Sequence, residues 1–143
     1  MNITEQLNRQ IANFQVLNFK LHHYHWRVSG PHFFTLHAKF EEWYDRAAAY
    51  TDDLAERVLA LQGEPPVTLQ QCLGLASLKE AAGGETAEQM VRTLAEDVSI
   101  LISELKETAA EADEAGDRPT ADMLTDFQTE LEKDAWMLRA FLA

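Results

Sequence analysis

Four long stretches of this 143-residue chain repeat apolar residues every three or four positions, the period of one face of an α-helix. The first stretch begins after Asn2 and ends at Ser29-Gly30-Pro31, and the second runs from about Phe33 to Leu61. The third lies between Thr86 and about Ala112, and the fourth begins near Asp117-Arg118-Pro119. The pattern predicts an all-α protein built on four long helices.

Capping signals mark where these helices begin. Asn2 is followed three residues later by Glu5, and Thr86 by Gln89, which is the spacing of a capping box. The fourth helix has Asp117 as an acidic N-cap with a proline soon after it.

A long connection, roughly residues 63 to 85, separates the second helix from the third. Gly63, Pro65 and Pro66 end the second helix, and Thr68 starts a short helix that we expect to reach about Leu75. Two helical pairs joined by one long crossover fit a ferritin-like four-helix bundle better than a simple up-down bundle. We therefore predict a single ferritin-like domain over residues 1–143.

The charge balance limits the possible partners. The chain has 24 acidic and 12 basic residues, a formal net charge of −12, and its lysines and arginines are scattered singly. Such a surface repels phosphate backbones and attracts cations. The first ten residues do not form a secretory signal, and no apolar run approaches the roughly 18 residues of a membrane span. With one cysteine, Cys72, and so no intrachain disulfide, a cytoplasmic protein without membrane contact is expected.

The candidate chemistry lies on the second helix. All five histidines fall between positions 22 and 37, and His37 is followed on the same helix by Glu41, Asp52 and Glu56. At about 100° per residue, these four side chains share an arc of about a quarter turn beside the apolar stripe. Imidazole and carboxylate ligands without thiolate suit iron, manganese or zinc, and iron is our preferred metal.

The four ligands cannot bind one ion within a single chain. His37 and Asp52 are separated by about 22 Å along a helix, whereas metal–ligand bonds are about 2 Å long. Either they form two separate sites, or a two-fold axis brings His37 and Glu41 of one chain near Asp52 and Glu56 of another. His25, near the end of the first helix, could complete the His37 side.

Other interpretations of these residues remain open. A helical His/Glu or Asp/Glu pair four residues apart is commonly a solvated or salt-bridged surface pair. Asp52 and Glu56 could pair with Arg57 or another basic neighbour, and His25 could be an interior or interface histidine. A purely structural acidic bundle without metal is the corresponding alternative function.

A family resemblance favours the metal hypothesis. The run HWRVSGPHFFTLHAKFEEWYDRAAAYTDDLAERVLALQG, residues 25 to 63, strongly resembles the Dps family, the mini-ferritins first named as DNA-binding proteins from starved cells. The similarity continues through VTLQQCLGLASLKEA in the crossover, and again at DMLTDF and WMLRAFLA near the C-terminus, so it covers nearly the whole chain.

The resemblance implies a hollow dodecamer that oxidises Fe(II), with hydrogen peroxide or dioxygen as oxidant, and stores the ferric mineral as protection against oxidative damage. By motif, the ferroxidase ligands fall on His25 and His37 of one subunit and on Asp52 and Glu56 of another. The fifth position of the family, usually Asp, is Glu41 here, and it is expected to support a second iron or to orient a bound water.

Two further features follow from the same resemblance. Trp26 matches a tryptophan that could quench stray oxidants, with an interface aromatic as the alternative. Asp113, Asp117 and Asp122 are candidates for an acidic ion-entry pore, which Arg118 would weaken or partly neutralise. Asp117 is equally explained as a helix N-terminal acid.

DNA compaction is the competing function that the family name suggests. Family members that compact DNA use a flexible basic tail, whereas here the first helix begins almost at once and the chain ends at FLA without a Lys- or Arg-rich extension. DNA binding is therefore not expected.

Overall fold

The computed structural model describes residues 1–143 and contains five α-helices without strands. The helices are α1 (Ile3–Arg27), α2 (Phe33–Ala60), α3 (Leu69–Leu75), α4 (Ala87–Glu114) and α5 (Arg118–Leu142). The predicted architecture, four long helices with a short extra helix in the crossover, is confirmed.

The predicted helix starts are present as hydrogen-bonded caps. Complete capping boxes precede α1, α3 and α4, formed by the Asn2/Glu5, Thr68/Gln71 and Thr86/Gln89 pairs. Each box satisfies two backbone groups that a helix end would otherwise leave unpaired.

The end of α2 differs in detail from the prediction. Gln62, not a glycine, adopts the left-handed conformation with φ 65°, and the N–H of Gly63 donates to the carbonyl of Val58 at 2.9 Å. This is the Schellman type of helix ending, one residue before the expected breaker.

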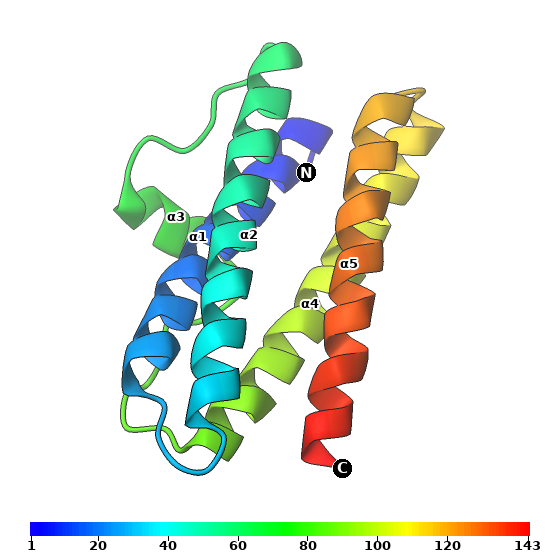
Figure 1. The fold of residues 1–143 in the computed structure, drawn as a ribbon. Helices are drawn as coiled ribbons and strands as arrows, with labels where there is room; N and C mark the ends of the chain where they lie inside the picture. Colours follow the sequence, from blue (N-terminus) through cyan, green and yellow to red (C-terminus); the bar gives the residue numbers. More distant parts are fainter.

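The helices form two antiparallel pairs, α1 with α2 and α4 with α5, and α1 also packs on α4 (Figure 1). The segment from residue 61 to residue 86 runs along the bundle from the end of α2 to the start of α4, so that α2 and α4 point the same way (Figure 1). The short helix α3 lies on this crossover and packs against α1. None of the helices combines enough length and apolar character to cross a membrane.

The bundle interior is filled by apolar side chains. A contiguous cluster of 27 buried residues joins the four long helices. Near its middle, the ring of Tyr50 stacks on Phe127 with centroids 4.0 Å apart and meets the edge of Phe14 at 5.0 Å, which ties α1, α2 and α5 together. Burying side chains of this size contributes roughly 1.5–3 kcal/mol each.

Two ion pairs, each with a buried carboxylate, connect helices across this core. Lys20 on α1 donates to Asp97 on α4 at 2.8 Å, and Arg46 on α2 pairs with Asp134 on α5. Burial raises the pKa of Asp97 and of Asp134, although the paired cation opposes the shift in each case. Removing one partner would leave an uncompensated buried charge, so these pairs fix which helix faces meet.

The crossover is attached to the bundle by a polar network. The Glu104 carboxylate on α4 accepts hydrogen bonds from Gln10 and Asn13 of α1 and from the hydroxyl of Ser77, at 2.8, 3.0 and 2.6 Å. Asn13 also accepts from the backbone N–H of Ser77 at 2.7 Å. These contacts place the start of the loop before α4 directly against α1.

Candidate metal centre

The sharp turn between α1 and α2 brings two of the predicted ligands together. His25 lies in the last turn of α1 and His37 in the second turn of α2, and their rings stack with centroids 3.7 Å apart and an interplanar angle of 11°. Gly30, with φ 103°, allows the chain to reverse between them.

Each of these histidines is held by the backbone of the other. Nδ1 of His25 lies 2.7 Å from the carbonyl oxygen of His37, and Nδ1 of His37 lies 2.7 Å from the carbonyl oxygen of His25. Because a carbonyl only accepts, Nδ1 carries the proton in both rings. The lone pair is therefore on Nε2, the arrangement that orients an imidazole for metal binding.

Glu41 adds a carboxylate to this pair. Its Oε1 lies 3.7 Å from Nε2 of His25, and its side chain is 56% exposed, whereas His25 is only 8% exposed. Two atoms bound to one ion at about 2.1 Å each lie at most about 4.2 Å apart, so this spacing is compatible with a shared ion. We call His25, His37 and Glu41 the histidine half-site.

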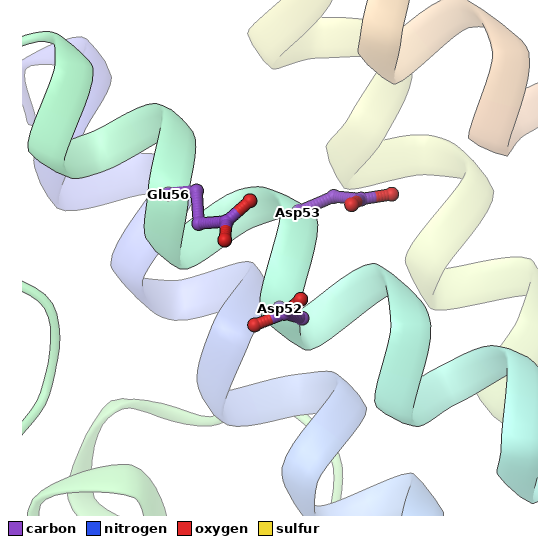
Figure 2. A group of neighbouring side chains, drawn as sticks. All are labelled: Asp52, Asp53 and Glu56. Atoms are coloured by element: carbon purple, nitrogen blue, oxygen red, sulfur yellow. The ribbon is translucent and has the colours of Figure 1, made fainter.

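A second cluster of potential ligands lies further along α2. Asp52, Asp53 and Glu56 place one carboxylate oxygen each within 4.8 Å of one another, and all three residues are exposed (Figure 2). None of the three makes a salt bridge within the chain. We call them the carboxylate half-site.

The structure excludes one alternative interpretation of this cluster and adds one residue to it. Arg57 is not the partner of Asp52 or Glu56, because its guanidinium donates to Asp117 at 2.9 Å and to the Thr120 hydroxyl at 2.8 Å. Asp53 was missed because it sits at about 160° from His37 on the helical projection, outside the arc of the other ligands.

The two half-sites do not meet within one chain. The helix α2 is continuous from Phe33 to Ala60, so the rise of about 22 Å between His37 and Asp52 remains. The bundle interior is filled by apolar side chains such as Phe14 and Phe127, and its two buried carboxylates, Asp97 and Asp134, are each paired with a cation.

The aromatic side chain that lies against His25 is not the one next to it in the sequence. Trp26 follows His25 directly in the sequence, yet its ring packs against His22 and Phe19, with centroid distances of 5.7 and 6.5 Å. The residue is 60% exposed. Tyr44, which the sequence did not single out, meets the His25 ring edge-on at 5.4 Å. Partial burial and the charges of Glu41 and Asp45 raise the pKa of Tyr44.

The three candidate pore acids lie around the α4–α5 turn but differ in their hydrogen-bond and ion-pair partners. Asp117 accepts from the backbone N–H and the hydroxyl of Thr120 and from Arg57. Although burial opposes the shift, these bonds lower the pKa of Asp117. Asp113 accepts from Arg118 at 3.0 Å, and Asp122 is exposed without an ion pair. Asp117 thus acts as the N-cap of α5, and Arg118 offsets the charge of one neighbouring acid.

The bundle and its separated His/carboxylate sets define a class of protein, the ferritin-like proteins, and comparison with known families agrees. The ferritin-like domain model matches residues 4–143. The DNA protection during starvation protein of Brevibacillus brevis is 54% identical over 136 residues, which cover 95% of this chain and 91% of that protein.

Solved structures identify the family within the ferritin-like proteins. Dps from Staphylococcus aureus superposes with a TM-score of 0.97 at 45% identity, covering 99% of this chain and 95% of that one. Dps from Vibrio cholerae O1, described as a member of a broad superfamily of ferritin-like diiron-carboxylate proteins, superposes with a TM-score of 0.95 at 35% identity, covering 99% and 89%. This chain belongs to the Dps family.

Proposed function

We propose that this protein oxidises Fe(II) to Fe(III), preferentially with hydrogen peroxide, at sites formed between two copies of the chain. The observation that carries the proposal is that the continuous helix α2 has one set of metal-binding groups near its start, completed by His25 of α1, and a second set further along, too far apart to share an ion. A two-fold axis that pairs antiparallel copies of α2 would place the histidine half-site of each beside the carboxylate half-site of the other.

The available groups fit iron as the substrate. Asp52 and Glu56 would bind the first ferrous ion, and the Nε2 atoms of His25 and His37 would complete its shell from the other copy. Glu41, close to Nε2 of His25, would support a second, weaker ion or orient a water molecule. Nitrogen and oxygen donors that leave positions open for water and oxidant suit a metal that turns over.

Two ferrous ions at one site allow peroxide to be reduced without release of a radical. Each ferrous ion loses one electron, and hydrogen peroxide takes up both electrons with two protons to give two water molecules. No hydroxyl radical is formed, because the oxygen–oxygen bond is broken by a pair of electrons. Protection against oxidative damage would follow from the removal of both reactants.

We further propose that the chain, as a single domain over residues 1–143, assembles into a hollow dodecamer that stores the ferric product. The support is the family membership, the two half-sites and the net charge of −12, which would concentrate cations at the protein. Large exposed apolar side chains, including Phe34, Trp136 and Leu69, are available for contacts between copies.

Direct DNA compaction is not part of the proposal, although DNA protection appears in the name of a relative. Six of the 12 basic residues are already paired with acids of the same chain: Lys20, Lys39, Arg46, Arg57, Arg92 and Arg118. Little positive charge is left to neutralise phosphates.

The test is a double variant of the carboxylate half-site. Asp52→Ala with Glu56→Ala should leave the fold intact, because neither side chain is in the core or makes a salt bridge within the chain. It should slow peroxide-dependent Fe(II) oxidation by more than about 100-fold, since loss of even an outer-shell partner of a metal ligand costs about 10–100-fold. Stopped-flow absorbance of the ferric product measures the rate. Asp126→Ala with Glu132→Ala, two exposed acids on α5, is the matched control.

Mixing variants tests whether the site is shared. His37→Ala should be inactive on its own for lack of an imidazole. When it is co-assembled in equal amounts with the double variant, half of the two-fold interfaces are mixed and each has one intact site, so about a quarter of the wild-type activity should return. Absence of any recovery in verified mixed particles would contradict a site shared between chains.

A further inference from the structure

One of the five clustered histidines faces the crossover instead of the histidine half-site. His23 precedes His25 by two residues on α1, which places it about 200° away around the helix. Its Nε2 lies 3.8 Å from Oε1 of Glu85, the residue just before the N-cap of α4. The end of α1 and the end of the crossover therefore meet at these two side chains (Figure 1).

The two facing atoms are buried and have no hydrogen-bond partner. The side chain of His23 is 27% exposed and that of Glu85 is 11% exposed, yet Nε2 and Oε1 themselves are shielded from solvent. Their separation of 3.8 Å exceeds the range of a hydrogen bond, so neither atom satisfies the other. Because buried polar atoms are normally paired, two unpaired atoms that face each other indicate a binding site.

The Glu85 carboxylate is held in place through its second oxygen. Oε2 accepts hydrogen bonds from the hydroxyl of Tyr24 at 3.0 Å and from the backbone N–H of Ala82 at 3.2 Å. Gly83 and Gly84, with φ 90° and 78°, form the turn between Ala82 and Glu85. Although burial opposes the shift, backbone N–H groups and the Tyr24 hydroxyl lower the pKa of Glu85. Oε1 therefore belongs to an ionised carboxylate and is free to bind a cation.

The distance between the two atoms fits a shared metal ion. Zinc binds imidazole nitrogen and carboxylate oxygen at about 2.0–2.2 Å, which sets the two atoms about 3.4 Å apart in a tetrahedral shell and at most about 4.2 Å apart. The observed 3.8 Å lies between these values, and it is close to the 3.7 Å between Nε2 of His25 and Oε1 of Glu41. Nitrogen and oxygen donors without thiolate suit zinc, iron or manganese.

The surroundings of Glu85 attract cations. Glu85 is at the wall of a polar cavity of about 630 Å³ between α1, the end of the crossover and α4. The charged side chains of this wall are four acids and two lysines: Glu80, Glu85, Glu96, Asp97, Lys20 and Lys79. Because the acids outnumber the lysines, the wall has a net negative charge, which raises the local concentration of cations beside Glu85.

The remaining histidines outside the histidine half-site have other contacts. Nδ1 of His22 donates to the carbonyl oxygen of Asn18 at 2.8 Å, and the His22 ring stacks on Tyr44 with centroids 3.6 Å apart. His32 is exposed at the N-cap of α2. Neither is paired with a carboxylate, so His23 is the one histidine outside the half-site that faces an acid.

We propose that His23 and Glu85 bind a divalent metal ion of the zinc class, at a site separate from both half-sites of α2. Each chain has one such site, because both ligands come from the same chain. Water molecules complete the coordination shell, since the protein supplies two ligands. The ion links α1 to the segment that leads into α4. The site does not depend on the proposed ferroxidase function, because neither ligand belongs to a half-site.

Anomalous X-ray diffraction from zinc-soaked crystals of the assembled protein locates the ion directly. Data collected on both sides of the zinc absorption edge should show a peak within about 2.2 Å of both Nε2 of His23 and Oε1 of Glu85. A map without a peak at this position would overturn the proposal.

Zinc binding in solution is measured by equilibrium dialysis of the metal-free assembly followed by metal analysis. His23→Ala and Glu85→Gln should each bind one zinc ion per chain fewer than the wild type. Glu85→Gln removes the charge but keeps an oxygen for the bonds from Tyr24 and Ala82. His32→Ala and Glu80→Gln are the matched controls, since both residues are exposed, and they should bind as many ions as the wild type.

Two results would contradict the site. Equal zinc binding by the wild type, His23→Ala and Glu85→Gln would show that these side chains hold no ion. The second concerns iron, because Glu85→Gln should oxidise Fe(II) with peroxide at the wild-type rate. If it loses both the zinc ion and this activity, Glu85 supports the α2 sites and a separate site does not exist. If the wild type itself does not oxidise Fe(II), the proposed function fails while the zinc measurements still decide this site.

Discussion

The histidine half-site, at the turn between α1 and α2, and the carboxylate half-site, further along α2, have opposite environments in the folded chain. His25 and His37 are packed against each other, and each ring is bonded to the backbone of the other. Asp52, Asp53 and Glu56 are exposed and crowd like charges together without a cation. Folding of one chain thus completes and orients one set of groups, while the other set keeps an unrelieved charge that an ion can neutralise.

The largest expected difference between the half-sites is the loss of stability when a histidine is replaced in the metal-free protein. His25→Ala deletes the hydrogen bond to the His37 carbonyl and leaves that carbonyl without its partner, so the free energy of unfolding should fall by about 1–3 kcal/mol. Urea unfolding without metal measures it. His32→Ala, an exposed histidine whose side chain makes no capping bond, should change stability by less than about 0.5 kcal/mol. Equal effects of the two variants would show that the reciprocal bonds do not stabilise the fold.

A smaller and pH-dependent effect is expected at Asp117, an acid that the chain uses itself. Replacement by Ala removes the cap of α5 and should cost about 1 kcal/mol at neutral pH. Since the folded-state pKa of Asp117 is lowered, its ionised form stabilises the fold above the unfolded pKa of about 4, and this stabilisation is lost as the pH falls through the folded pKa.

The stability difference between wild type and Asp117→Asn isolates that charge, because Asn keeps the capping ability. The difference should therefore be present at pH 7 and disappear as the pH falls below the folded-state pKa of Asp117, where both proteins are uncharged at this position. Thermal unfolding across this range is the measurement. Asp122→Asn, at an exposed acid without an ion pair, should show no such pH dependence, and a matching trend there would point to a general charge effect.

The smallest expected effect is a gain in stability instead of a loss. Asp52 and Glu56 are like charges four residues apart on a helix, so Asp52→Asn should raise the stability of the metal-free protein by about 0.2–0.5 kcal/mol. The gain should vanish at 1 M salt, where the screening length is about 3 Å. A loss of stability at low salt would mean that the carboxylate half-site has a structural partner after all.

Sequence reasoning predicted the fold closely because the helix boundaries depend on neighbouring residues. Asn2, Thr68, Thr86 and Asp117 all cap the helices that their sequence contexts predicted. Helical spacing alone also groups His37, Glu41, Asp52 and Glu56 on one arc of α2, whereas His25, on α1, was added by the family resemblance and Asp53 was not predicted.

The contacts that the sequence could not predict depend on the angle and distance at which the helices cross. The exchange of hydrogen bonds between His25 and His37 requires two backbones to approach at one angle and distance. The same is true of the Tyr44–His22 stack and of the pairing of Arg57 with Asp117, whose partners are 22 and 60 residues apart. In each case the local pattern allowed several partners, and only the packing selected one.

The uninterrupted α2 helix also restricts how this protein can change over evolution. Inserting one residue between His37 and Asp52 would turn one half-site by about 100° relative to the other and move it by about 1.5 Å, so the two half-sites could no longer meet in the proposed shared centre. The crossover between α2 and α4, by contrast, can lengthen at little cost. Relatives should therefore keep this fifteen-residue spacing while their loop lengths drift.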